Sequence, residues 1–322
     1  MRRILVTGAN GFIGSGLLRS LPASDWHVRG ALRSLNALPA RVQFEPVMVG
    51  EIEAATVWDA ALRGVDSVVH LAARAHVMRE SANEPLKEYR RVNVAGTLRL
   101  AQQAASAGVR RFIYMSSIKV NGEGSLAVGQ PYHVDQAPAP VDPYGVSKHE
   151  AELLLRELAQ ETGMEIVVIR PVLVYGPGVK GNFLSMMRWL RKGIPLPFGA
   201  IDNRRSLVGV NNLVDLVRTC LDHPAAANQT FLVSDGEDLS TTELLRRLGE
   251  KIGTGARLLS VPSGMLVAAA TLCGRRNVAQ RLCGSLQVDI SKTRGLLAWS
   301  PPHSVDHELE RAAAAFLNLS SS

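Results

Sequence analysis

ILVTGANGFIG, the stretch from Ile4 to Gly14, decides the fold of this chain. An apolar run of strand character leads directly into glycines at positions 8, 11 and 14, and a helical pattern follows at residues 16–21. Glycines let the backbone turn tightly and approach a pyrophosphate, while the N-terminus of a helix offers free N–H groups and a positive dipole to phosphates. The stretch therefore predicts a strand, a tight turn and a helix that together bind a dinucleotide.

The length and composition are those of a globular α/β protein. The chain has 322 residues, of which 46% are hydrophobic and 20% charged, enough for one large or two fused domains. Its net charge of +7 suits an anionic small molecule. Because there is neither a run of like charges nor a nucleic-acid motif, we expect no nucleic acid as a partner.

Cysteine usage bears on metals and on compartment. Cys220, Cys273 and Cys283 lack the spacing of metal ligands, so we expect no metal site. Their odd number favours a reducing compartment. No signal peptide is visible before the first apolar strand, and we therefore expect a cytoplasmic location.

Strand and helix patterns alternate through the first half of the chain. Helices are expected at 92–107 and 144–162, and strands at 28–32, 42–45, 65–71, 112–116 and 166–170. Strands separated by helices indicate a doubly wound parallel sheet of the Rossmann type. We assign residues 1–175, with about 206–234, to this dinucleotide-binding domain.

Regularity fades after Tyr175, where Pro and Gly mark loops around one short helix at 183–191. Two further strands, 206–210 and 230–233, are expected to rejoin the main sheet. Residues 236–316 are mainly helical in pattern. We assign 176–205 and 235–322 to a smaller, mostly helical substrate-binding domain.

The most apolar later stretch runs from Leu258 to Cys273 and contains Pro262 and Gly264. It is too short and too broken for a membrane span. It predicts a buried helix beginning near Pro262. A helix on a membrane surface is the alternative, because Arg275 and Arg276 follow.

A candidate catalytic group follows from two spacings. Tyr144 and Lys148 are four residues apart, so a helix places them on one face. A nearby ammonium lowers the cost of forming a phenolate, and we expect Tyr144 to exchange a proton near neutral pH. Ser116 and Ser117 stand at the C-terminal end of a predicted parallel strand, the edge where such sheets bind ligands.

The motifs together resemble the extended short-chain dehydrogenase/reductases, in the sugar-nucleotide epimerase/dehydratase branch, over nearly the whole chain. The matching segments are TGANGFIG at 7–14, HLAA at 70–73, NVAGT at 93–97 and RPVLVYGPG at 170–178. Ser117, Tyr144 and Lys148 match the family's catalytic triad.

The resemblance implies a role for each matching residue. Tyr144 would be the acid/base, Lys148 would bind the nicotinamide ribose, and Ser117 would hold the reacting oxygen of the substrate. Ser116 would lie close to the nicotinamide, and Asn93 would be structural. The other residues implied to bind the cofactor are Gly8, Asn10, Gly11, Phe12, Ile13, Gly14, Arg33, Glu51, Ile52, Leu71, Ala72, Ala73 and Pro171.

The residues at the end of the second expected strand indicate which cofactor the chain prefers. NAD-specific relatives usually place an Asp there, whereas this chain has Leu32 followed by Arg33, with Arg29 nearby. An arginine in place of an acid suits a 2′-phosphate. We therefore favour NADP(H), with NAD(H) as the alternative.

The reaction expected is a reduction. Ile118 and Lys119 replace the acidic pair of the sugar dehydratases, which leaves a 4-ketoreductase or a 4-epimerase that retains its cofactor. Segments 70–78 and 115–123 resemble bacterial reductases of UDP-4-keto-6-deoxy-N-acetylhexosamines, which serve surface-polysaccharide synthesis. The reductase is our main expectation and a UDP-hexose 4-epimerase the alternative. A catalytically silent sensor or scaffold is the rival class, against which the intact triad argues.

The family resemblance also indicates residues for a UDP-sugar substrate. These are Ser117 and Lys119 near the triad, Asn182 and Arg205 on the diphosphate, and Phe198 beside the base. A second diphosphate arginine has three candidates, none of which aligns cleanly: Arg275, Arg276 and Arg281. Relatives dimerise through helices equivalent to 84–107 and 144–162, which predicts a homodimer with a four-helix interface.

Overall fold

The computed structural model describes residues 2–34, 44–75, 84–124, 129–274, 279 and 282–318. Its main element is a seven-stranded sheet in the order β3-β2-β1-β4-β5-β6-β9, in which every neighbouring pair is parallel. The strands are β1 Arg2–Thr7, β2 Trp26–Leu32, β3 Glu45–Met48, β4 Ser67–His70, β5 Arg111–Met115, β6 Glu165–Pro171 and β9 Thr230–Val233. The strand order reverses direction between β1 and β4, and ligands of such sheets bind outside the carboxyl ends there.

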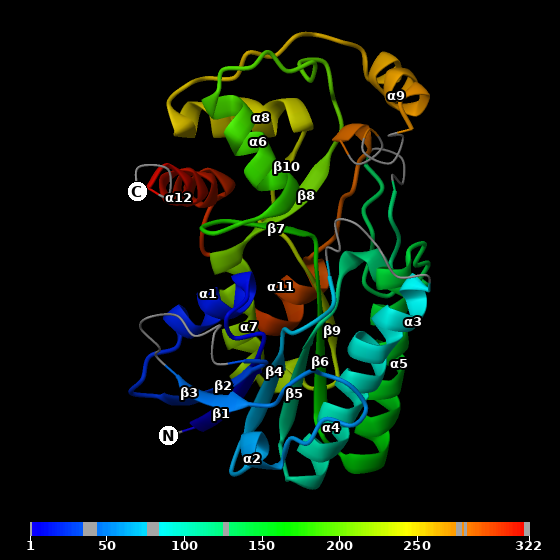
Figure 1. Ribbon diagram of the computed structural model, residues 1–322, viewed down its shortest axis with the longest axis vertical. Coiled ribbons are helices and arrows are strands. Elements are labelled where there is room, and N and C mark those ends of the chain that lie inside the picture. The colour runs from blue at the N-terminus through cyan, green and yellow to red at the C-terminus, as the bar shows by residue number, and fades with distance from the viewer. Residues whose placement is uncertain are drawn as a thin grey trace.

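Helices cover both faces of this sheet (Figure 1). Alternate residues of β1 face opposite sides, so Ile4 belongs to one core cluster and Leu5 to the other. The first face carries α1 Phe12–Ser20, α7 Val210–Asp222 and α11 Ser291–Leu297. The second carries α2 Asp59–Leu62, α4 Thr97–Ser106 and α5 Pro143–Thr162. The doubly wound Rossmann-type architecture expected from the sequence is thus confirmed.

A second, smaller sheet lies above the first in Figure 1, with the order β10-β8-β7. Its strands are β7 Leu173–Tyr175, β8 Arg205–Gly209 and β10 Asp238–Leu239. It packs with α6 Gly181–Arg191, α8 Thr241–Ile252 and α12 Val305–Asn318 around a third core cluster.

The two sheets are joined without linkers. β6 ends at Pro171 and β7 begins at Leu173, so a single residue separates a strand of the large sheet from one of the small sheet. β8 ends at Gly209, and α7 begins at the next residue to pack on the large sheet.

Three expectations about these elements are wrong. The strand near 206–210 does not rejoin the main sheet, because β8 pairs with β7 and β10; only β9 adds to the edge of β6. The third strand occupies Glu45–Met48 rather than 42–45, where residues 42 and 43 lie outside the described part. The stretch after Pro262 forms α9, Ser263–Leu272, but none of the residues of this helix is buried.

The helix expected at 92–107 is a π-helix in its first part and an α-helix in its second part. A short α3, Pro85–Tyr89, continues into a π-helix over Arg90–Gly96, and α4 follows. π-Helical turns occur often at functional sites. Here the turn brings Gly96 so close to Ile52 that a Cβ on Gly96 would lie 2.7 Å from the Ile52 side chain.

Among the described residues, α-helical segments that combine the length and the apolar character needed to cross a bilayer are absent.

Candidate active site

The glycine turn has the shape that a dinucleotide pyrophosphate requires. Gly8 has a φ of +65°, and the Gly11 N–H donates to the Gly8 carbonyl oxygen at 2.9 Å. A Cβ on Gly14 would lie 2.1 Å from that same oxygen, which excludes every larger residue. α1 begins at Phe12 with no side-chain cap and no acid in its first turn. Its free N–H groups and positive dipole are therefore available to phosphates, and this part of the structure fits a dinucleotide.

The end of β4 is fixed beside this turn by Thr7. The Thr7 hydroxyl oxygen accepts from the backbone N–H groups of Leu71 at 3.2 Å and Ala72 at 3.1 Å. The same hydroxyl pairs with Nδ1 of His70 at 2.7 Å, and Nε2 of His70 pairs with the Thr97 hydroxyl at 2.9 Å. Burial, with a contribution from Lys148, lowers the pKa of His70 to about 3, so this imidazole stays neutral.

Arg33 and Glu51 lie together at the far side of the predicted cofactor site. Nη1 of Arg33 is 3.7 Å from Oε1 of Glu51, and both side chains are exposed. Arg33 thus has a carboxylate neighbour, contributed by the loop after β3 rather than by the end of β2. Arg29 is unavailable as a phosphate ligand, because its guanidinium donates to the carbonyls of Ala61 and Arg63 and pairs with Glu45.

The triad residues come from two neighbouring elements. α5 starts at Pro143 and is capped by Asp142, whose carboxylate accepts from the Gly145 N–H at 2.6 Å. This start places Tyr144 in the first turn and Lys148 one turn later on the same side. Nζ of Lys148 lies 5.8 Å from the centre of the Tyr144 ring.

Lys148 is directed at the end of β5, where Ser117 also lies. Its buried ammonium donates to the Met115 carbonyl at 2.8 Å. Two residues later the Ser117 hydroxyl oxygen accepts from the Lys119 N–H at 3.3 Å and caps a short 3₁₀ turn, Ile118–Val120. Ser117 at the strand end and Lys148 on the helix therefore lie close together at the carboxyl edge of the sheet, as the sequence predicted.

In this structure the pKa of the Tyr144 phenol does not lie near neutral pH, and the effect of Lys148 on it stays a prediction. Desolvation raises the pKa of the Tyr144 phenol well above its ordinary value, and Asp142 and Tyr89 act in the same direction. Burial also lowers the pKa of Lys148 to about 7, against the opposing influence of Glu152. Both groups lose hydration on burial, and this disfavours the charged form of each.

A buried ionic network behind the triad was missed by the sequence analysis. Glu152 is fully buried on α5 and accepts from Nε and Nη2 of Arg170 at 2.9 and 2.5 Å. The Ser116 hydroxyl donates to the same carboxylate at 2.5 Å, and Nη1 of Arg170 donates to Asn121 at 2.9 Å. The available signal was the spacing from Lys148 to Glu152, which continues the inner face of α5.

The hydrogen-bond partners of Ser116 and Asn93 bear on the roles expected for these two residues. The Ser116 hydroxyl faces Glu152, so its approach to a nicotinamide stays a prediction. Asn93, in the π-helix, accepts from the Arg74 N–H at 2.8 Å and donates to Ser147 at 3.0 Å. Asn93 therefore joins the loop after β4 to α5, which agrees with a structural role.

The residues expected to bind substrate are spread over both parts of the molecule. Lys119 is next to the triad: its ammonium lies 5.9 Å from the centre of the Tyr144 ring and forms ion pairs with Glu123 and Asp142. Asn182 is exposed in the first turn of α6, and Phe198 packs against the core of the smaller sheet.

Arg205 begins β8, where its Nη1 donates to the Gly284 carbonyl at 2.8 Å. The three candidates for a second diphosphate arginine, Arg275, Arg276 and Arg281, lie outside the described residues. Whether Pro171, buried at the end of β6, meets a cofactor stays a prediction.

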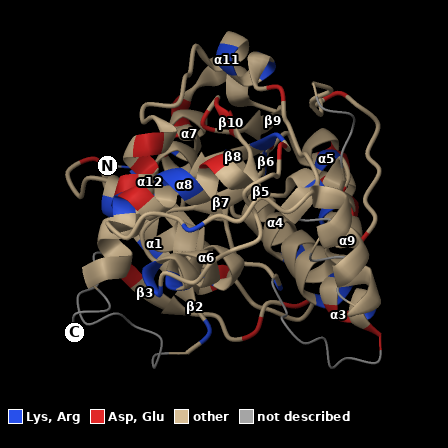
Figure 2. Cartoon of the chain, turned by 90° about the horizontal axis from the view of Figure 1, so that it is seen from above, with Lys and Arg blue, Asp and Glu red and all other residues tan. Residues whose placement is uncertain are grey.

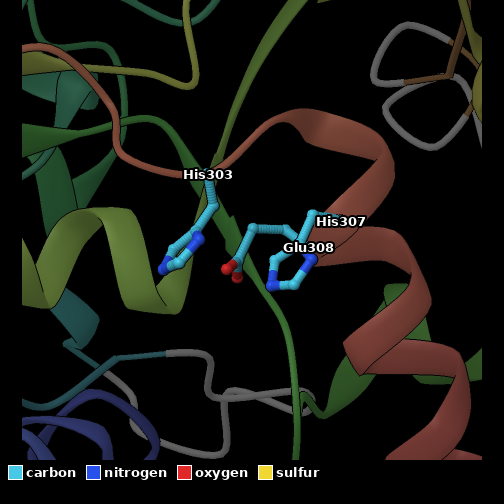
Figure 3. A group of neighbouring side chains, drawn as sticks. All are labelled: His303, His307 and Glu308. Atoms are coloured by element: carbon cyan, nitrogen blue, oxygen red, sulfur yellow. The ribbon is translucent and has the colours of Figure 1, made fainter.

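One group of side chains in the described part of the chain has metal-ligand chemistry. His303, His307 and Glu308 have ligand atoms within 4.8 Å of one another at the start of α12 (Figure 3). Both carboxylate oxygens of Glu308 already accept from the Asn211 amide, at 2.8 and 2.9 Å, which gives this buried side chain a partner without a metal. The group lies apart from the triad on the chain, and our expectation of no metal stays a prediction.

Comparison with known proteins gives one family. Residues 4–234 match the NAD dependent epimerase/dehydratase family. A UDP-glucose 4-epimerase of Vibrio cholerae is 50% identical over 318 residues, covering 98% of this chain and 96% of the relative. A GDP-6-deoxy-D-mannose reductase of Pseudomonas aeruginosa is 28% identical and covers 96% of this chain and 95% of its own.

Among solved structures, UDP-glucuronic acid 4-epimerase from Bacillus cereus, in complex with UDP-glucuronic acid and NAD, superposes with a TM-score of 0.77. It is 26% identical, and the match covers 98% of this chain and 99% of that one. The matched region includes the glycine turn, the end of β4 and the triad. With its parallel sheet, its glycine turn and its Ser-Tyr-Lys group, the chain belongs to the NAD dependent epimerase/dehydratase family.

Proposed function

We propose that this chain is a 4-epimerase of a UDP-linked hexose. The observation that carries the proposal is the 50% identity to a UDP-glucose 4-epimerase along almost the full length of both chains. It favours the epimerase alternative over the 4-ketoreductase that we expected from short segments of the sequence. The complete triad argues against a silent sensor or scaffold, because a protein that only binds needs no acid/base group at the strand end.

The residues proposed to hold the cofactor would line the carboxyl edge of the sheet. Gly8 to Gly14 and the N-terminus of α1 would meet the pyrophosphate. Arg33, Glu51 and Ile52 would lie at the adenosine end. Leu71, Ala72 and Ala73 would line the middle, and Lys148 the nicotinamide ribose. A bound nicotinamide dinucleotide would supply reversible hydride transfer at C4 of the sugar.

The protein's own part in the reaction is proton transfer and positioning. In its phenolate form Tyr144 would take the proton from the C4 hydroxyl as hydride leaves C4 for the bound nicotinamide, and the phenol so formed would return that proton when hydride comes back, while Ser117 hydrogen-bonds the same oxygen. Lys148, whose pKa lies at about 7, would supply positive charge beside Tyr144 in the weakly acidic to neutral range. Residues 176–205 and 235–322 would hold the nucleotide part of the substrate.

The test is interconversion of UDP-glucose and UDP-galactose by the purified chain without added cofactor. Tyr144→Phe removes the proton carrier but keeps the ring, and we expect turnover to fall by roughly 10²–10⁴-fold. Tyr132→Phe is the matched control, because the Tyr132 hydroxyl donates to the Gly124 carbonyl at 3.0 Å, away from the triad. Equal activity of Tyr144→Phe and the wild type would refute the assignment of the acid/base.

A 4-ketoreductase is the second candidate, supported by Arg33 at the end of β2 and by the 28% identical reductase. A reductase draws NADPH from solution and consumes it once for each turnover. The two functions therefore separate in one experiment: NADPH loss with a UDP-4-keto-6-deoxy sugar supports the reductase, and UDP-hexose interconversion without net NADPH loss supports the epimerase.

We also propose a homodimer formed in each chain by α5 and by the helical stretch 84–107, which contains α3, the π-helix and α4. α5 carries an exposed Leu153 on its outer side. Light scattering at micromolar concentration should give twice the chain mass of 34.7 kDa. The mass of a single chain would refute this proposal.

A further inference from the structure

α9 is an apolar helix whose residues are exposed or only partly covered in the described structure. Its sequence, SGMLVAAATL, has no charged residue, and none of its ten residues is buried. Met265 is 63% and Leu272 89% exposed, and Leu259, just before the helix, is 56% exposed. A helix that is hydrophobic on all sides is normally covered by a protein core or by lipid. The described part of the chain covers Leu266, Val267 and Ala270 only in part and leaves Met265 and Leu272 exposed, so this apolar face is open to a partner.

The charges that flank α9 in the sequence favour an anionic surface as its partner. From Lys251 to Val288 the chain contains no Asp or Glu, and its charged residues are all positive: Lys251, Arg257, Arg275, Arg276 and Arg281. Arg257 is exposed, six residues before the helix. By contrast, α8 and α12 carry charges of both signs (Figure 2). An apolar helix within an acid-free, basic segment is complementary to an anionic surface with an apolar interior.

The dimensions of α9 fit a membrane surface and exclude a span. Ten residues make a helix about 15 Å long. The hydrocarbon core of a bilayer is about 30 Å thick. α9 also forms an outer corner of the molecule, at the end farthest from the N-terminal strands (Figure 1), where a flat surface can reach it.

We propose that α9, with Leu259 and Arg257, docks the protein on a bilayer rich in anionic phospholipid. Met265, Leu272 and Leu259 enter the acyl boundary, and the exposed Arg257 meets the headgroups. The segment before α9 is tied to the loop that holds Phe198, since the Gly199 N–H donates to the Leu259 carbonyl at 2.9 Å. Docking would therefore bring the small-sheet side of the molecule to the membrane. The proposal does not depend on which sugar the enzyme takes.

The test is sedimentation of the full chain with vesicles. One set contains equal parts of phosphatidylglycerol and phosphatidylcholine, and the other contains phosphatidylcholine alone. We expect binding to the anionic set only, weakened by high salt. Leu272→Glu should reduce that binding at least about tenfold, because one large apolar side chain leaves the acyl region and a repelled charge replaces it.

Val57→Glu is the matched control: Val57 is 65% exposed on the main-sheet part of the molecule, and this variant should bind as the wild type does. Thermal unfolding checks that both variants are folded. Equal binding to both vesicle sets, or equal loss in the two variants, would overturn the proposal. A larger mass for the wild type than for Leu272→Glu in the absence of lipid would also overturn it, because α9 would then be covered by a second copy of the chain.

Discussion

Replacing Glu152 by Gln should strongly destabilise the fold, because it removes the charge that compensates Arg170. Both side chains are buried, at 0% and 2% exposure. Nε and Nη2 of Arg170 donate to the carboxylate at 2.9 and 2.5 Å, and no other acid forms an ion pair with Arg170 in the described residues. Breaking a buried ion pair from one side costs about 3–5 kcal/mol. We expect a loss of about 3 kcal/mol, because the Gln oxygen still accepts one hydrogen bond.

Urea unfolding at neutral pH measures this loss directly. Glu157→Gln is the control, because Glu157 lies on the same helix but is exposed. The double variant Glu152→Leu with Arg170→Met should be less destabilised than Glu152→Gln, since it leaves no unpaired buried charge. If Glu152→Gln unfolds within about 0.5 kcal/mol of the wild type, the range of ordinary surface substitutions, the ion pair does not stabilise the fold as argued.

Three further outcomes follow from the site. Arg33→Ala should raise the dissociation constant for NADPH about tenfold and leave that for NADH nearly unchanged, because one charge-assisted phosphate contact is lost; equal effects on both cofactors would show that Arg33 does not bind the 2′-phosphate. Since the folded pKa of His70 is about 3, below the ordinary 6.5, the unfolded chain gains a proton first as the pH falls. Stability should drop by about 2 kcal/mol between pH 6.5 and 5, and His70→Gln should flatten this slope in urea titrations at the two pH values; parallel slopes would refute it. Gly14→Ala should abolish dinucleotide binding in a calorimetric titration, whereas Gly16→Ala, whose Cβ would meet only side chains at 3.3 and 3.4 Å, should retain it.

Local signals predicted the parts of the fold that local chemistry determines. The glycine turn was predictable because Gly14 admits no Cβ, and the Tyr144–Lys148 pair because a helix fixes the direction of residues four apart. The parallel sheet followed from short apolar runs such as 166–169 that alternate with helical patterns along the chain.

Long-range pairing and solvation were not predictable in the same way. Nothing in the five residues of β8 distinguishes a strand of the small sheet from one of the large sheet, because both are buried on two faces. The exposure of α9 was missed because an apolar segment reads as core unless the partner that covers it is known. The pKa of Tyr144 depends on how much water the folded chain removes, and sequence spacing carries no information on that.

The direct joints between the two sheets have a mechanical consequence. One residue separates β6 from β7, and none separates β8 from α7. The two sheets are therefore connected by two very short backbone segments. A hinge between two sheets needs a few residues whose backbone dihedral angles can change, and these connecting segments contain almost none. We therefore expect access to the catalytic edge to be gated by the loops around it, with the two sheets moving as one block. In temperature or pressure experiments both layers should then lose their amide protection together.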